Sequence, residues 1–175
     1  MEKHFLSAND FTLDSFRLGK VIWDSGWRPD AIVPIWRGGA PVGVCVHEFL
    51  KYKGLSPEHY VLKCGSYAGI DQRGQVVFDH AEELYEQIAK GSKVLFIDDV
   101  FDSGRTALDI KETLGGHFSE LRFAMVYWKP SRNTTNLVPD FYVRKTEEWI
   151  VFPHEIEGLT LDEVGQKSAD LRALL

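Results

Sequence analysis

The stretch from residue 98 to residue 106 contains side chains that could hold a phosphorylated sugar. It reads Asp-Asp-Val-Phe-Asp-Ser-Gly-Arg-Thr and directly follows an apolar run at 93–97. That run predicts a buried parallel strand, and the residues from 105 onward predict a helix. The backbone N–H groups of residues 103–106 should then point outward at a helix N-terminus, a geometry that binds phosphate.

Single side chains within this stretch suit the same ligand. Ser103 and Thr106 add hydroxyl donors, and Gly104 allows a backbone conformation or a close approach that a Cβ would hinder. The adjacent acids Asp98 and Asp99, which we expect just beyond the buried part of the strand, are costly unless a cation, hydroxyl donors or water meet them. The hydroxyls of a sugar, or a magnesium ion carried by the substrate, would satisfy both carboxylates. A solvated turn with a capping aspartate explains each residue alone, but the whole string favours a binding site.

Residues 94–107 resemble the signature of type I phosphoribosyltransferases, which bind phosphoribosyl pyrophosphate (PRPP). That signature is a hydrophobic strand, two acids, a short spacer and Asp-Thr/Ser-Gly-x-Thr; Arg105 stands where relatives often have glycine. The resemblance implies that Asp98 and Asp99 hold the ribose hydroxyls, and that Asp99 contacts Mg²⁺ directly or through water. It implies that the loop after Asp102, Arg105 included, binds the 5′-phosphate. Asp102 itself occupies the place of an acid near the purine N7, which implies a role in proton transfer.

Arg37, Gly38 and Gly39 follow another predicted strand and resemble the pyrophosphate loop of the same family. Bare backbone at the two glycines would let N–H groups approach a diphosphate, and Arg37 would supply a planar cationic fork. An ordinary strand-to-helix turn with a surface arginine is the alternative.

The segment 66–74 resembles the flexible hood loop of the family. Such a loop can close over pyrophosphate and exclude water from the reacting carbon. Arg73 is the candidate cation of that loop, and Lys63, at the end of the preceding strand, is a second candidate phosphate ligand.

Lys129 and Trp149 resemble the base-binding residues of the 6-oxopurine branch, particularly the bacterial xanthine–guanine enzymes. In that branch the lysine donates to the exocyclic oxygen of the purine, the aromatic ring stacks on the base, and the next residue, here Ile150, contacts the base edge through its backbone. An ammonium group facing the amine of adenine would leave a buried polar group unpaired. Trp149 as an ordinary core residue is the alternative. His154, just past this segment, is a candidate to support the residues that touch the ligand.

Strands and helices alternate along the chain, which predicts an α/β fold with a mainly parallel sheet flanked by helices. A small hood and base-binding region should lie beside it. Strands are expected near 30–35, 60–63, 93–97, 123–128 and 140–143, and helices near 7–25, 40–50, 79–90 and 105–114. Residues 64–75 are rich in glycine and polar residues and are expected to form an exposed, mobile loop or a hairpin. The candidate segments begin where predicted strands end, which is where ligands bind in such sheets.

Length and charge limit the other possibilities. The chain of 175 residues fits a single domain over residues 1–175, and its net charge of −6 disfavours broad nucleic-acid binding. No apolar run approaches the roughly 18 residues of a membrane span. The N-terminus lacks a signal-peptide pattern, so we expect the cytoplasm. Cys45 and Cys64 are expected to be thiols rather than a disulfide or zinc site.

Residues 158–175 form a tail that the resemblance does not explain. Thr160 and Glu163 have the spacing of a capping box. Five residues then recur at three- and four-residue steps and predict one apolar stripe on a final helix: Leu161, Val164, Ser168, Leu171 and Leu175. The stripe would pack on its own domain or on another subunit, and because family members are commonly oligomers we expect a homodimer or larger.

The reaction that the resemblance implies joins a purine to the sugar of PRPP. A ring nitrogen of hypoxanthine, guanine or xanthine displaces pyrophosphate from the anomeric carbon, through a transition state with positive charge on the ribose. An enzyme acting on orotate, uracil or adenine is one alternative, which Lys129 and Trp149 disfavour. A PRPP-sensing regulator without turnover is the other, disfavoured by the lack of room for a DNA-binding domain and by the acidity of the chain.

Overall fold

The computed structural model describes residues 3–66, 76–79 and 81–175. Its main sheet has the strand order β5 (Val76–Asp79), β4 (Leu62–Ser66), β2 (Ala31–Trp36), β6 (Lys93–Phe101), β7 (Glu120–Trp128) and β8 (Phe141–Lys145), and the short β3 (Glu58–His59) pairs with β2. Neighbouring strands from β4 to β8 are parallel, and β5 runs antiparallel to β4. The prediction of a mainly parallel sheet flanked by helices is therefore confirmed.

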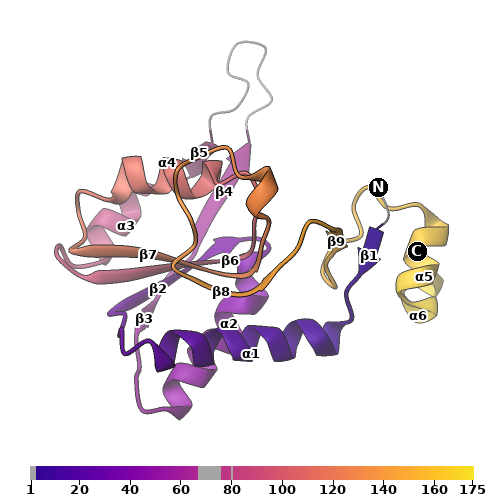
Figure 1. Cartoon of the computed structure of the whole chain (residues 1–175), viewed down its shortest axis with the longest axis horizontal. Helices are drawn as coiled ribbons and strands as arrows, with labels where there is room; N and C mark the ends of the chain where they lie inside the picture. The colour runs from indigo at the N-terminus through magenta and orange to yellow at the C-terminus, as the bar shows by residue number, and fades with distance from the viewer. Residues whose placement is uncertain (1–2, 67–75, 80) are drawn as a thin grey trace, which may run out of the picture.

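Helices cover both faces of this sheet (Figure 1). The helices are α1 (Ala8–Asp24), α2 (Gly39–Tyr52), α3 (Ala81–Gln87), α4 (Arg105–Leu114), α5 (Leu161–Lys167) and α6 (Ala169–Ala173), and a 3₁₀ turn, η1, spans Pro130–Arg132. Helices α1 and α2 pack with Leu95 and Ile97 of β6 on one face. Helices α3 and α4 pack with Val94 and Phe96 on the other. Alternate side chains of the central strand thus enter two separate cores.

Local signals explain where α1 begins and ends. Ser7 caps the helix by accepting a hydrogen bond from the backbone N–H of Asp10 at 3.1 Å. Gly26, with a φ of +80°, turns the chain after the last helical residue. The sequence allowed either Ser7 or Thr12 as the cap; Ser7 is the cap, and the predicted end near Ser25 is confirmed.

The central strand is longer than predicted. We expected β6 to end at Ile97, but it continues through Phe101 because β7 pairs alongside, with Asp98 opposite Met125 and Val100 opposite Tyr127. The acids therefore lie inside a paired strand, and the expectation that they lie beyond its buried part was wrong. The antiparallel pairing of β4 with β5 agrees with the hairpin alternative for residues 64–75, although the strand at 76–79 was not itself predicted.

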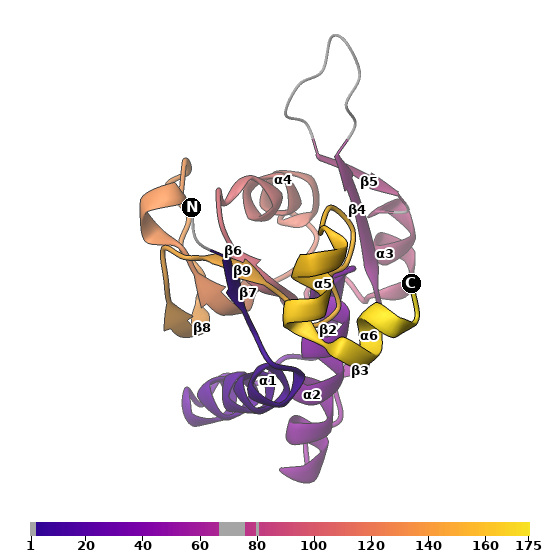
Figure 2. The ribbon, with the colours of Figure 1, turned by 90° about the vertical axis from the view of Figure 1, so that its right-hand side faces the viewer.

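A second, small sheet lies beside the main one. Strand β1 (Lys3–Phe5) runs parallel to β9 (Trp149–Val151), so the N-terminal segment pairs with a strand from the C-terminal part of the chain. Together with α5 and α6 it lies at one end of the molecule in Figure 1 and faces the viewer in Figure 2.

The tail forms two short helices rather than one. The capping box of Thr160 and Glu163 is present. Ser168, however, has extended backbone and caps α6 through its side chain, which interrupts the predicted stripe. Val164 is buried, whereas Leu161 and Leu175 are exposed, so a continuous buried stripe was a wrong prediction. Within the described ranges, every helix falls short of the length and apolarity needed to cross a bilayer.

Candidate functional site

The turn after β2 lies directly against the end of β6. A Cβ added at Gly38 would overlap the carboxylate of Asp99, and one added at Gly39 would overlap the carbonyl oxygen of Ile97. Only glycine allows this approach, so the two glycines have a packing role that sequence reasoning did not identify. The peptide bond between Trp36 and Arg37 is cis.

Asp98 and Asp99 interact directly with each other. Asp99 is only 7% exposed, and its backbone N–H donates to Oδ1 of Asp98 at 2.9 Å. Burial raises the pKa of Asp98 well above its ordinary value, and the negative charge of Asp99 raises it further. The Nε2 atom of His154 lies 3.3 Å from Oδ2 of Asp99. The two acids thus combine an oxygen-rich surface with an electrostatic need for a cation or for hydroxyl donors.

The loop after β6 surrounds a small cavity of about 90 Å³. Its lining includes Asp98, Asp102, Ser103, Gly104 and Thr106. Gly104 has a φ of +78° directly before α4, as its predicted conformational role requires. A Cβ there would also lie 2.7 Å from Oδ1 of Asn133. The predicted helix N-terminus behind a glycine-bearing loop is confirmed, and it gives the cavity donors suited to an anion.

The loop from Asn133 to Thr135 packs against the loop that lines this cavity. The backbone N–H of Thr134 donates to the carbonyl of Ser103 at 3.0 Å. This contact joins segments about thirty residues apart, and no local pattern indicates it.

A cationic pair lies on the other side of Asp102. The Nε atom of Arg132 donates to Oδ1 of Asp102 at 2.6 Å, and Nζ of Lys129 lies 3.7 Å from its Oδ2. Lys129 is buried, and its Nζ lies 5.9 Å from the centre of the Trp149 ring. Trp149 is 47% exposed, which excludes the alternative that it is an ordinary core residue. Lys129, Trp149 and Asp102 are thus brought together.

Arg132 was missed by sequence reasoning. Its only signal was its place two residues after Pro130, in a turn that η1 forms after β7. Ile150 is buried, and its side chain belongs to the core and not to the exposed face of Trp149.

The remaining predicted residues lie at the margins. The Nη2 atom of Arg37 lies 3.1 Å from Oε2 of Glu157, and both side chains are exposed. Lys63 is exposed on β4, with its Cα opposite that of Trp36. Arg105 is exposed in the first turn of α4. Arg73 falls outside the described residues.

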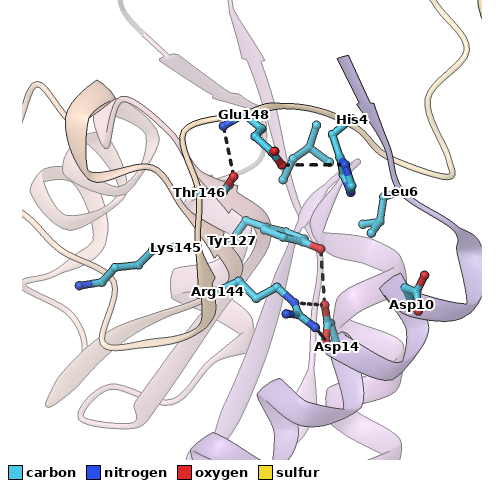
Figure 3. Close-up of a pocket in the computed structure, with 10 residues that line it drawn as sticks. His4, Leu6, Asp10, Asp14, Tyr127, Arg144, Lys145, Thr146 and Glu148 are labelled. Atoms are coloured by element: carbon cyan, nitrogen blue, oxygen red, sulfur yellow. Dashed lines mark hydrogen bonds and ion pairs between the residues drawn. The ribbon is translucent and has the colours of Figure 1, made fainter. Parts of the chain in front are cut away.

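A separate cavity of about 340 Å³ is lined by residues of β1, α1, β7, β8 and β9 (Figure 3). Its deepest polar group is Asp14 of α1, to which Arg144 donates two hydrogen bonds, at 2.6 and 3.1 Å. Arg17 donates another at 2.6 Å, and the hydroxyl of Tyr127 lies 3.4 Å away. Burial raises the pKa of Asp14, but the hydrogen bonds and charges of Arg144 and Arg17 outweigh it, so that pKa lies below its ordinary value. Burial raises the pKa of Tyr127 to about 12.

Comparison with known proteins gives a family profile and a curated relative. The sequence profile of the phosphoribosyl transferase domain matches residues 17–160. A xanthine-guanine phosphoribosyltransferase of Cereibacter sphaeroides is 30% identical over 136 residues, which cover 76% of this chain and 72% of that protein.

Solved structures have the same fold. A purine phosphoribosyltransferase from Pyrococcus horikoshii superposes with a TM-score of 0.71 and 28% identity, covering 91% of this chain and 98% of that one. A Neisseria gonorrhoeae protein solved with bound ppGpp gives a TM-score of 0.74 at 22% identity, with 97% of both chains covered. On the profile match over residues 17–160 and the 30% identical relative, this chain belongs to the phosphoribosyltransferase family.

Proposed function

We propose that this enzyme transfers the 5-phosphoribosyl group of PRPP to a 6-oxopurine, namely hypoxanthine, guanine or xanthine. The observation that carries the proposal is the buried ammonium of Lys129, which lies beside the exposed ring of Trp149 and the carboxylate of Asp102. A flat base stacked on Trp149 would offer its carbonyl oxygen to Lys129, whereas the amine of adenine would place a donor against the ammonium donor of Lys129. The printed names of the relatives, xanthine-guanine and purine phosphoribosyltransferases, support this substrate class.

The groups that hold PRPP would be divided between two loops. The cavity lined by Ser103, Gly104 and Thr106 suits the 5′-phosphate. Arg37 and the glycine turn suit the diphosphate. The exposed ion pair of Arg37 with Glu157 contributes little in water, so a diphosphate could readily replace Glu157.

Magnesium fits the acid pair. Carboxylate oxygens are the ligands that Mg²⁺ prefers, and it is usually bound by one or two carboxylates together with substrate phosphates. Across residues 3–66, 76–79 and 81–175 there is no group of three or more potential metal ligands. Asp99 and Asp98 would therefore share the ion with oxygens of PRPP, and when bound it would neutralise charge on the diphosphate.

The chemical step exchanges one bond at the anomeric carbon for another. The carbon–oxygen bond to the diphosphate breaks, the diphosphate keeps the electron pair, and a ring nitrogen of the purine forms the new bond. The acid pair would hold the ribose while Trp149 and Lys129 hold the base in line. Asp102, kept in place by Arg132, would accept or share the proton at the purine N7.

A panel of free bases tests the proposal. The protein is incubated with PRPP, MgCl₂ and each of hypoxanthine, guanine, xanthine, adenine, orotate and uracil, and nucleotide formation is followed by chromatography. We expect product with one or more 6-oxopurines. Product with only adenine, orotate or uracil would overturn the substrate class, and PRPP binding without product from any base would favour a sensor.

A further inference from the structure

His154 reaches the acid pair from a segment far along the chain. Its Nε2 atom lies 3.3 Å from Oδ2 of Asp99, and the side chains are 23% and 10% exposed. The contact joins the turn after β9 to the central strand β6. It therefore couples the C-terminal part of the chain to a carboxylate that the proposed function assigns to PRPP and Mg²⁺.

The ring of His154 is held by aromatic packing. It stacks on Phe152, with centroids 5.6 Å apart and planes at 17°, and it packs against Phe11 at 5.7 Å. Its Nδ1 is buried and has no hydrogen-bond partner in the described part of the chain. A hydrogen on the buried Nδ1 would have no acceptor. In a neutral ring the hydrogen is therefore assigned to Nε2, which faces the carboxylate of Asp99.

The backbone that carries His154 is secured from both sides. Within the turn, the N–H of Phe152 donates to Oε2 of Glu155 at 3.0 Å. From α5, the ammonium of Lys167 donates to the carbonyls of Phe152, at 2.6 Å, and of Glu155. The tail thus fixes the turn that aims the imidazole.

We propose that His154 is a positioning residue for PRPP binding. The contact with Nε2 of His154 engages one oxygen of Asp99, and Gly38 packs against the same carboxylate. The ligand then does not have to order a freely rotating group. An oriented carboxylate binds a hydroxyl or a magnesium ion without that loss of entropy. This inference rests on the proposed function and adds to it a residue that does not itself touch substrate.

Two substitutions separate positioning from simple packing. His154→Phe keeps an aromatic ring between Phe11 and Phe152 but removes the donor. His154→Gln places an amide N–H near the position of Nε2. We expect H154F to weaken PRPP binding in the presence of MgCl₂ by roughly tenfold, the size of one hydrogen bond to a charged group. H154Q should recover most of that loss, and KM for the base should stay unchanged in both.

The measurements are calorimetric titration of PRPP with MgCl₂ and steady-state kinetics with each substrate varied. His59→Gln is the matched control, because His59 is exposed and contacts only His47 among the described rings. Native PRPP affinity in H154F would reduce His154 to a packing residue and overturn the inference. Failure of the wild-type protein to bind PRPP would instead overturn the proposed function.

A measurement on the unaltered protein guards against a variant that does not fold. ¹⁵N NMR of the histidine side chains reports which ring nitrogen carries hydrogen. Protonated Nε2 in His154, with its signal shifting when PRPP and MgCl₂ are added, is the expected result. A ring with hydrogen only on Nδ1 would turn a lone pair toward Asp99 and contradict the proposal.

Discussion

In the proposed function, Lys129 is the residue that selects the base. Its ammonium is buried, yet it has a carboxylate 3.7 Å away and an exposed indole face beside it. Burying a charge is costly, and a chain retains one where it has a partner to meet. Asp102 needs no help from Lys129 to stay paired, because Arg132 contacts it at 2.6 Å. The lysine is therefore available to a carbonyl acceptor.

Lys129→Met removes this donor and keeps most of the side-chain volume. We expect kcat/KM for a 6-oxopurine to fall by a factor that corresponds to roughly 1–3 kcal/mol of lost transition-state stabilisation. The affinity for PRPP should barely change. Kinetics with each substrate varied in turn measure both, with the exposed Lys53→Met as control. If PRPP affinity collapses and base use is untouched, Lys129 belongs to the phosphate site.

Asp99→Asn tests the acid pair. Asparagine has the same shape, and its carbonyl oxygen can still accept from His154, so the melting temperature should change little. Because it lacks the charge that holds Mg²⁺, we expect kcat/KM for PRPP to fall roughly 10- to 100-fold. The exposed Asp24→Asn serves as control. Near-normal dependence on magnesium and PRPP in the variant would refute the role of Asp99.

One buried carboxylate, that of Asp14, connects the elements around the proposed base site. Asp14 joins α1 to Arg144 of β8 and to Tyr127 of β7 (Figure 3). Lys129 follows Tyr127 by two residues, and Trp149 follows Arg144 by five. The cluster therefore sets the relative position of the two strands that lead to the proposed base-binding side chains.

Asp14→Asn should destabilise the fold by about 1–3 kcal/mol near pH 7, because it leaves two arginines without their charged partner. The pKa of Asp14 is lowered in the folded protein, so its stabilising effect is complete above the unfolded pKa of about 3.9 and is lost as pH falls through the folded value. Urea unfolding of wild type and D14N should therefore differ at pH 7 and converge at acid pH. A constant difference between pH 7 and pH 3 would contradict this account, and Asp24→Asn is again the matched control.

At the scale of the whole molecule, the C-terminal tail contacts the N-terminal strand and packs on the rest of the fold. Glu163 of α5 accepts from Nζ of Lys3 at 2.6 Å, and Val164 is buried. Leu161, Leu174 and Leu175 remain exposed, and they are the tail residues available to a subunit contact.

Deletion of residues 159–175 is expected to lower the free energy of unfolding by about 2–4 kcal/mol, from the lost burial of Val164 and the hydrogen bonds of Lys167. We also expect the intact protein to be a homodimer or larger. Chemical unfolding and light scattering of both chains measure these quantities. A monomeric intact protein ends the assembly prediction, and equal stability of the shortened chain would mean that the tail stabilises nothing.

The signals that the sequence carried reliably were local ones. The run at 93–97, the glycine before α4 and the capping box of Thr160 each depend on neighbours within a few residues. Composition and spacing therefore sufficed to predict the start of β6, the glycine-bearing loop before α4 and the start of α5. The family resemblance rested on the same contiguous stretch. Lys129 and Trp149 were identified as partners because the resemblance supplied a contact between segments that spacing alone does not give.

What tertiary structure alone decided are the contacts between distant segments. The extension of β6 through the acids depends on pairing with β7, and the contacts of His154 with Asp99, Arg132 with Asp102 and Glu157 with Arg37 depend on turns that pack together only in the folded chain. The break at Ser168 likewise follows from its side chain capping α6 against a pattern that favoured one helix. Periodicity reports which face of an element is apolar, but the partner of a polar side chain is set by where other elements place their atoms.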